Sequence, residues 1–172
     1  MHRELLLLGV LRRGNLHGYG INEFIQRDMA FCTDLKKPTA YHLLQKMADA
    51  GWIEEQEVQE GNRPPRRIYH VTPDGEAAFQ RLLRENLRAH FTTYFDGDMG
   101  LAFIDALPAD EALSLLHERQ VGLKAALNTL ESVRGHSTGG LQFILEHQKR
   151  YLAFEIHWLD EVMMHLSQPK ED

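Results

Sequence analysis

The sequence predicts a mainly α-helical chain in two parts, with one β-hairpin in the first part. Apolar residues recur at spacings of three and four over most of the chain, which is the helical period. Two short strand-like runs flank a stretch rich in Gly, Asn and Pro between residues 52 and 71, which is typical of a hairpin. Residues 1–90 hold 13 Lys/Arg against 12 Asp/Glu, whereas residues 91–172 hold 6 against 13. We therefore expect two domains, residues 1–90 and residues 91–172.

The composition is that of a folded globular protein. The 172 residues are 43% hydrophobic and 26% charged, with a formal net charge of −6, which is ordinary for such a chain. The single cysteine, Cys32, excludes a disulfide framework and a Cys-based zinc cluster. The longest apolar run, Leu5 to Leu11, is shorter than the ~20 residues that span a bilayer, and Arg12-Arg13 after it does not suit a signal peptide. The expectation is a cytoplasmic protein with no membrane partner.

Three helices are predicted at the start of the chain. Residues 4–13 are apolar almost all round, which indicates a helix buried on more than one side. A short second helix begins near Tyr19. The third begins at Pro38, because proline suits the first helical position, and ends at Ala50-Gly51. Its inward stripe has the spacing i, i+3, i+4, i+7: Ala40, Leu43, Leu44 and Met47.

A hairpin and a fourth helix follow. The strand-like runs are residues 52–58 and 67–71, and the polar residues between them form the hairpin tip. Thr72-Pro73-Asp74 then supplies an N-cap, a proline at N1 and an acid in the first turn, so a helix runs from there to about Leu87. This order of elements is that of a winged helix-turn-helix with a two-stranded β wing.

The second part is predicted to be an antiparallel helical hairpin. A short apolar helical stretch, residues 99–107, precedes it. Residues 110–133 and 141–166 each show heptad-like spacing, and residues 135–140 form the turn. The last helix also has a second apolar seam: Ile144, Tyr151, Phe154 and Trp158. One small hairpin cannot bury both seams, so a partner subunit is expected.

Two polar residues interrupt the heptad seams. A hairpin centred on the predicted turn places Gln120 opposite Glu155. One interpretation is a buried hydrogen bond between them that fixes the register. The other is a polar anchor for a small effector beside Tyr151, Phe154 and Trp158.

The outward face of the third helix is rich in hydrogen-bonding side chains on a cylinder that fits the major groove of DNA. These side chains are Thr39, His42, Gln45 and Lys46. Lys36 and Lys37 lie at the helix N-terminus, where two cations oppose the helix dipole unless a phosphate binds there. The alternative is an ordinary solvated face.

Arginines cluster at the predicted hairpin tip. Arg63, Arg66 and Arg67 lie beside Asn62 and two prolines, with no acid among the three arginines. Such a wing can grip the DNA backbone or enter the minor groove. The alternative is a solvated charged loop.

Three segments resemble the PadR family of transcriptional regulators: ELLLLGVLRRGNLHGYG (residues 4–20), KKPTAYHLLQKMADAGWIEE (residues 36–55) and GNRPPRRIYHVTPDGEAAF (residues 61–79). The matching motifs are His17-Gly18-Tyr19-Gly20, Thr39 to Tyr41, Gly51-Trp52-Ile53, Arg63 to Tyr69 and Val71-Thr72-Pro73-Asp74-Gly75. The C-terminal helices are more loosely similar to those of the longer members. Lys36-Lys37-Pro38 stands where the family commonly has a Ser-capped helix start.

The resemblance implies a homodimeric repressor that dimerises through its C-terminal helices and is relieved by an effector. A two-fold dimer would bind double-stranded DNA at a pseudo-palindromic operator. The residues then expected to contact base edges are Thr39, His42, Gln45 and Lys46. Those expected to contact the DNA backbone are Lys36, Lys37, Tyr41, Asn62, Arg63, Arg66 and Arg67.

Two other classes of function remain as alternatives. One is a winged-helix module whose third helix binds protein and not DNA. The other is a metal-dependent enzyme built on His157, Glu161 and His165, but three ligands over two helical turns lie too far apart for one ion, which favours a solvated face. The sequence has no Gly-rich phosphate loop or nucleophile motif, so neither catalysis nor a cofactor is expected. Cys32 is expected to be a packed small side chain.

Overall fold

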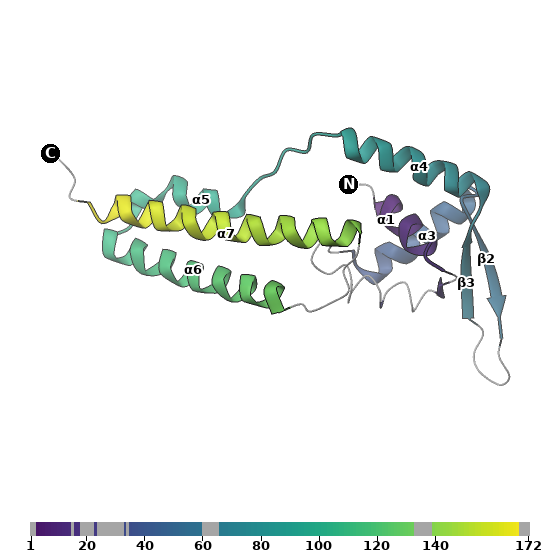
Figure 1. The fold of residues 1–172 in the computed structure, drawn as a ribbon, viewed down its shortest axis with the longest axis horizontal. Helices are drawn as coiled ribbons and strands as arrows, with labels where there is room; N and C mark the ends of the chain where they lie inside the picture. Colours follow the sequence, from purple (N-terminus) through teal and green to yellow (C-terminus); the bar gives the residue numbers. More distant parts are fainter. Residues whose placement is uncertain are drawn as a thin grey trace. The chain divides into compact units, whose positions relative to one another are not determined.

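The structure, a computed structural model, divides into two compact units, Met1–Thr92 and Thr93–Asp172. Both units are mainly helical, and the first contains the only sheet of the described residues (Figure 1). The predicted fold class is therefore confirmed. The described residues are 3–14, 16–17, 23, 33, 35–59, 66–132 and 139–168.

The first unit packs three helices around one hydrophobic core. They are α1 (Arg3–Leu11), α3 (Lys37–Asp49) and α4 (Pro73–Arg88). α1 contacts both α3 and α4, which explains why its sequence is apolar on more than one side. The fully buried side chains of this core are Leu7, Leu8, Leu35, Leu44 and Met47. The predicted second helix lies almost entirely outside the described residues.

The sheet has the strand order β1-β3-β2, and both pairings are antiparallel. β2 (Ile53–Val58) and β3 (Arg66–Val71) form the predicted hairpin, in a register that pairs Ile53 with Val71. β1 (Leu16–His17) adds a third strand that the sequence did not predict. Two residues are too short to show the alternation by which a strand is recognised. The hairpin tip, residues 60–65, lies outside the described residues.

The junction between the hairpin and α4 is formed as predicted. The Thr72 hydroxyl accepts a hydrogen bond from the Gly75 N–H at 3.0 Å and donates one to the Gly51 carbonyl at 2.6 Å. The Thr72 N–H donates to the Trp52 carbonyl at 3.0 Å. This single threonine therefore caps α4 and joins it to the end of α3.

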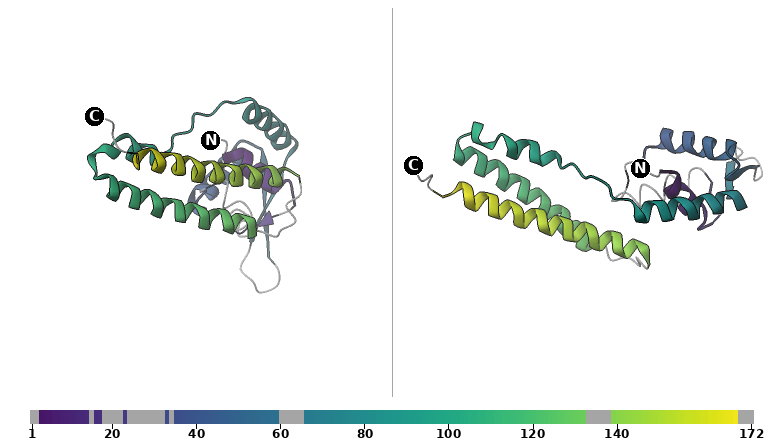
Figure 2. Two further views of the ribbon diagram at one scale, coloured as in Figure 1. Left: turned by 60° about the vertical axis from the view of Figure 1, so that its left-hand side comes forward. Right: turned by 90° about the horizontal axis from the view of Figure 1, so that it is seen from above.

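The second unit is built on two long antiparallel helices, α6 (Ala109–Ser132) and α7 (Gly140–Leu166), which lie side by side (Figure 2). The predicted apolar stretch before them forms two pieces, α5 (Asp96–Ala102) and the 3₁₀ turn η1 (Ile104–Ala106). The backbone of Gly139 has φ +70°, a left-handed conformation that suits glycine, just before α7 begins. Most of the predicted turn lies outside the described residues. No helix of the described residues is long and apolar enough to cross a membrane.

Candidate nucleic-acid interface

α3 presents a buried face and a polar face, as the sequence predicts. Ala40, Leu44 and Met47 are buried, and Leu43 is half-buried. On the outer side His42, Gln45 and Lys46 are exposed, whereas Thr39 is half-buried. The outer face is therefore available to a partner, with Thr39 at its margin.

Two lysines lie at the N-terminus of α3. Lys36 is the N-cap residue and Lys37 the first helical residue, so Pro38 occupies the second position and not the predicted first. No side chain caps this N-terminus, and the first turn has no acid. Both lysines are exposed, and the Lys37 ammonium lies 5.9 Å from the centre of the Tyr41 ring. The helix dipole and both cations therefore attract an anion at one place.

Two side chains of the outer face of α3 have partners within the unit. The Gln45 amide donates to the Asp49 carboxylate at 2.9 Å. The Lys46 ammonium lies 3.3 Å from the Glu4 carboxylate of α1, although the Lys46 side chain remains 66% exposed. Lys46 therefore lies on the α1 side of the face, which the helical spacing alone did not indicate. His42 is left at the centre of the exposed face.

The described part of the wing has more acidic than basic side chains. Arg67 pairs with Glu55 of β2 at 3.0 Å, and its side chain is 62% exposed. β2 also exposes Glu54 and Glu57, and Glu57 is paired in register with Arg67. Asn62 and Arg63 lie outside the described residues, and of Arg66 only the backbone is described. Any positive charge that the wing offers beyond that of Arg67 must therefore come from Arg63 and Arg66, toward the tip of the hairpin.

Tyr69 anchors the wing to the core. Its side chain is buried, and burial raises the pKa of the Tyr69 phenol, with the nearby Glu55 charge raising it further. Arg67 acts in the opposite direction by charge and by a hydrogen bond. The phenol consequently stays protonated and neutral beneath the wing.

The two polar seam residues of the second unit are buried, but they do not bond to each other. Arg119 donates to the Glu155 carboxylate at 2.7 Å. Gln120 donates instead to the Ile156 carbonyl at 3.3 Å and to Asp160. The predicted register is correct, because Arg119 and Gln120 lie opposite Glu155 and Ile156, whereas the expected direct Gln120–Glu155 bond is not formed.

These partners occupy the polar groups of the predicted effector anchor. Lys124 donates to the Gln120 amide oxygen at 2.8 Å. In the described part of the chain, no buried side-chain nitrogen or oxygen is without a hydrogen-bond partner. Gln120 and Glu155 therefore tie α6 to α7.

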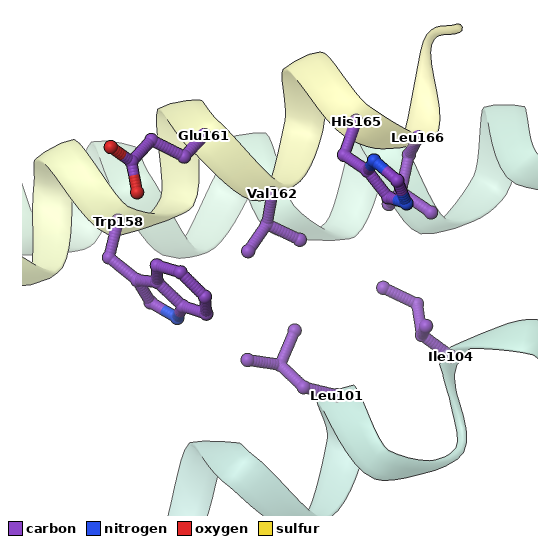
Figure 3. Close-up of a pocket in the computed structure, with 7 residues that line it drawn as sticks. All are labelled: Leu101, Ile104, Trp158, Glu161, Val162, His165 and Leu166. Carbon is purple, nitrogen blue, oxygen red and sulfur yellow. The ribbon is translucent and has the colours of Figure 1, made fainter.

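The aromatic residues of that predicted effector site are divided among different surroundings. Tyr151 stacks on Phe95 with ring centres 5.9 Å apart, and burial raises the pKa of its phenol. Phe154 is 64% exposed. Trp158 lines a cavity of about 400 Å³ between α7 and the α5–η1 segment (Figure 3). The sequence did not predict this cavity.

The α7 face that carries His157, Glu161 and His165 holds one ion pair. The His157 imidazole lies 3.4 Å from the Glu161 carboxylate, and both side chains are exposed. Among the residues that the structure describes, no group of three or more His, Cys, Asp or Glu side chains could hold a metal ion. Cys32 lies outside these residues.

A winged helix with an exposed polar third helix, followed by a helical hairpin, defines a class of winged-helix transcriptional regulators. Comparison with known proteins gives a family match for the first unit. Residues 7–81 match the model of the transcriptional regulator PadR-like family.

Individual relatives agree with this match. Over 125 residues the chain is 25% identical to the negative transcriptional regulator PadR of Bacillus subtilis (strain 168). The aligned residues are 73% of this chain and 69% of that protein. The structure of Bacillus subtilis PadR in complex with operator DNA has a TM-score of 0.83 and 22% identity, covering 97% of this chain and 100% of that one. The structure of the same protein in complex with p-coumaric acid has a TM-score of 0.79 and 20% identity, and the match covers 96% of this chain and 98% of that one.

A further similar structure is the virulence activator AphA of Vibrio cholerae, with a TM-score of 0.72, 18% identity and coverage of 95% of this chain and 96% of that one. At these identities the solved structures show a shared fold. That fold extends over both units of the chain.

Proposed function

We propose that this chain is a homodimeric repressor that binds double-stranded DNA at a pseudo-palindromic operator and is released by a small effector. The observation that carries the proposal is the exposed polar face of α3 next to an uncapped N-terminus with two lysines. Such a helix end suits a DNA phosphate, and such a face suits the major groove.

The roles within the first unit follow from position on α3 and the wing. Lys36 and Lys37 would hold a phosphate, which sets the helix in the groove. The side chains assigned to base edges are Thr39, His42, Gln45 and Lys46. Those assigned to the DNA backbone, besides the two lysines, are Tyr41, Asn62, Arg63, Arg66 and Arg67.

The second unit is proposed to dimerise the chain and to bind the effector. Large apolar side chains are exposed on it, among them Phe103, Phe143, Phe154 and Met164. Exposed apolar surface of this extent favours a subunit interface, and a two-fold interface sets the spacing of the two α3 helices. An effector that changes this spacing would weaken both half-sites together.

The solved structures of Bacillus subtilis PadR with operator DNA and with p-coumaric acid support this proposal by analogy of fold. A regulator of this kind acts where the chromosome is, so we place the chain in the cytoplasm. We assign it no catalytic activity and no cofactor.

The salt dependence of DNA binding tests the proposal. Genomic footprinting would first supply the operator, and the affinity for it would be measured by fluorescence anisotropy at several salt concentrations. Because each phosphate contact releases counterions, Lys36→Ala combined with Lys37→Ala should lower the slope of log K against log salt by about 2. The double variant Lys149→Ala with Arg150→Ala removes the same charge from α7 and should leave the slope unchanged.

Equal slopes for the two double variants would refute the role of the α3 N-terminus. If no genomic fragment shows salt-dependent binding, the chain is instead a winged-helix module that binds protein. That second function is the one favoured by the acidic β2 strand, whose Glu54 and Glu57 are exposed beside the wing arginines.

A further inference from the structure

The cavity in the second unit is closed on two sides by apolar side chains. Leu101 of α5 and Ile104 of η1 face Val162 of α7 across it, as Figure 3 shows. Its volume of about 400 Å³ is within the range of small-molecule sites. All of its walls belong to the second unit, so the site is complete within residues 93–172.

One stripe of α7 forms the opposite wall. Trp158, Val162 and Leu166 follow each other at i, i+4 and i+8 and share a face of the helix. Glu161 and His165 lie one position before Val162 and Leu166, at the margin of this stripe. The cavity therefore has an apolar floor and two ionisable groups at its edge.

The charges at the edge discriminate between ligands. Glu161 and His165 are the only ionisable residues among the seven described residues that line the cavity, and no Lys or Arg is among them. Glu161 lies one turn from the Trp158 indole on α7 (Figure 3). The described partner of the Glu161 carboxylate is the exposed His157 imidazole at 3.4 Å, which is not among the lining residues. A carboxylate and an indole that line one cavity both attract cations, whereas a carboxylate ligand would meet Glu161 with no Lys or Arg in the lining to pair with.

We propose that this cavity binds a small hydrophobic amine in its ammonium form. The apolar body of the ligand lies between Leu101, Ile104 and Val162, and the ammonium lies at Glu161 and Trp158. The proposed ligand thus differs in charge from the p-coumaric acid with which the Bacillus subtilis relative was solved. Binding at this cavity does not depend on DNA; only its use as an effector site rests on the proposed function.

Three probes with one apolar body and different charges test the proposal: 1-adamantylamine, 1-adamantanol and adamantane-1-carboxylate. None of them absorbs where tryptophan does. The chain has two tryptophans, so the Trp52→Phe variant leaves Trp158 as the only indole and its fluorescence as the signal. Calorimetric titration of the unchanged protein measures the same three affinities without any substitution.

The amine should bind about tenfold more tightly than the carboxylate, with the alcohol between them. Glu161→Gln should lower the affinity for the amine to that for the alcohol, and it should leave the affinity for the alcohol unchanged. Glu146→Gln is the matched control, because Glu146 is an exposed carboxylate of the same helix that pairs with Arg150 and is absent from the cavity. The control should bind all three probes as the unchanged protein does.

Several results would overturn the proposal: no probe binds, the carboxylate binds as tightly as the amine, or Glu161→Gln behaves like Glu146→Gln. Loss of amine binding as the protein concentration is raised would also overturn it, because a second copy of the chain would then cover the cavity. All titrations are made without DNA. Failure here therefore leaves the DNA-binding proposal standing, and failure of DNA binding leaves this one standing.

Discussion

Arg12 joins the end of α1 to the start of α4. Its guanidinium donates to the Glu76 carboxylate, with one bond of 3.0 Å, and lies 4.2 Å from the centre of the Phe79 ring. Hydrogen bonding by Arg12 lowers the pKa of Glu76 below its ordinary value of 4.5, and a hydrogen bond from Gln80 lowers it further. The charged form of Glu76 is therefore the form that stabilises the fold.

This pair predicts a pH dependence of stability. Because the pKa of Glu76 is lower in the folded state, its contribution is present above pH 4.5 and is lost as the pH falls through the folded-state pKa. Glu76→Gln should lower the free energy of unfolding at pH 7, and the difference from the unchanged protein should shrink as the pH falls below 4.5. Urea unfolding of both proteins, at pH 7 and at a pH below 4.5, measures this difference in the free energy of unfolding. Glu85→Gln, which removes an exposed i, i+4 pair with Arg81, is the control, and an equal pH effect in both variants would contradict the assignment.

At the scale of elements, the tightest junction is that between the β hairpin and α4. Gly75 in the first turn of α4 packs against the Trp52 carbonyl, and a Cβ at this position would overlap that oxygen. The Thr72 cap depends on the same approach of the two segments. Thus the glycine is needed for contact between backbones, and the requirement is steric.

Gly75→Ala should therefore destabilise the first unit, by about 1–3 kcal/mol as in other overpacked sites. Gly122→Ala is the matched control, because Gly122 lies inside α6 with nothing within 4 Å of an added Cβ. That substitution should stabilise the second unit by about 0.5–1 kcal/mol, since alanine favours helix. Hydrogen exchange resolved by segment measures both units in one experiment, and a neutral Gly75→Ala would contradict the steric argument.

At the scale of the whole molecule, the two units differ in what they leave exposed. The first buries its apolar side chains in one core. The second has few buried residues for its length and exposes many large apolar ones, including Phe143 at 77% and Phe154 at 64%. This difference favours a second unit that is completed by a partner subunit.

Phe154→Glu should convert the proposed dimer to a monomer, because an acid is placed on an apolar face. Operator affinity should fall by about a hundredfold or more, since the two half-sites would no longer be bound by one linked species. Light scattering coupled to size exclusion gives the mass, and anisotropy gives the affinity. Thr129→Glu adds the same charge to an exposed position of α6 and should remain dimeric; a Phe154→Glu variant that stays dimeric would refute the interface.

The amino-acid sequence by itself determined the local features of this protein. The inward stripe of α3, the two strands of the hairpin, the Thr72 cap and the long helix pair all follow from periodicity and capping, which depend on neighbours in the chain. The burial of Gln120 and Glu155 was also predictable from heptad spacing, and the register of α6 against α7 was predictable from the position of the turn between them.

Only the tertiary structure decided which side chains meet. Glu155 binds Arg119 and not Gln120, Lys46 lies near Glu4, and Arg67 pairs with Glu55. The cavity beside Trp158 needs α5, η1 and α7 together. These features depend on side-chain directions and on segments far apart in the chain, and neither is contained in a periodicity. The outward face of α3 was thus predictable as a surface, whereas the partners of its side chains were not.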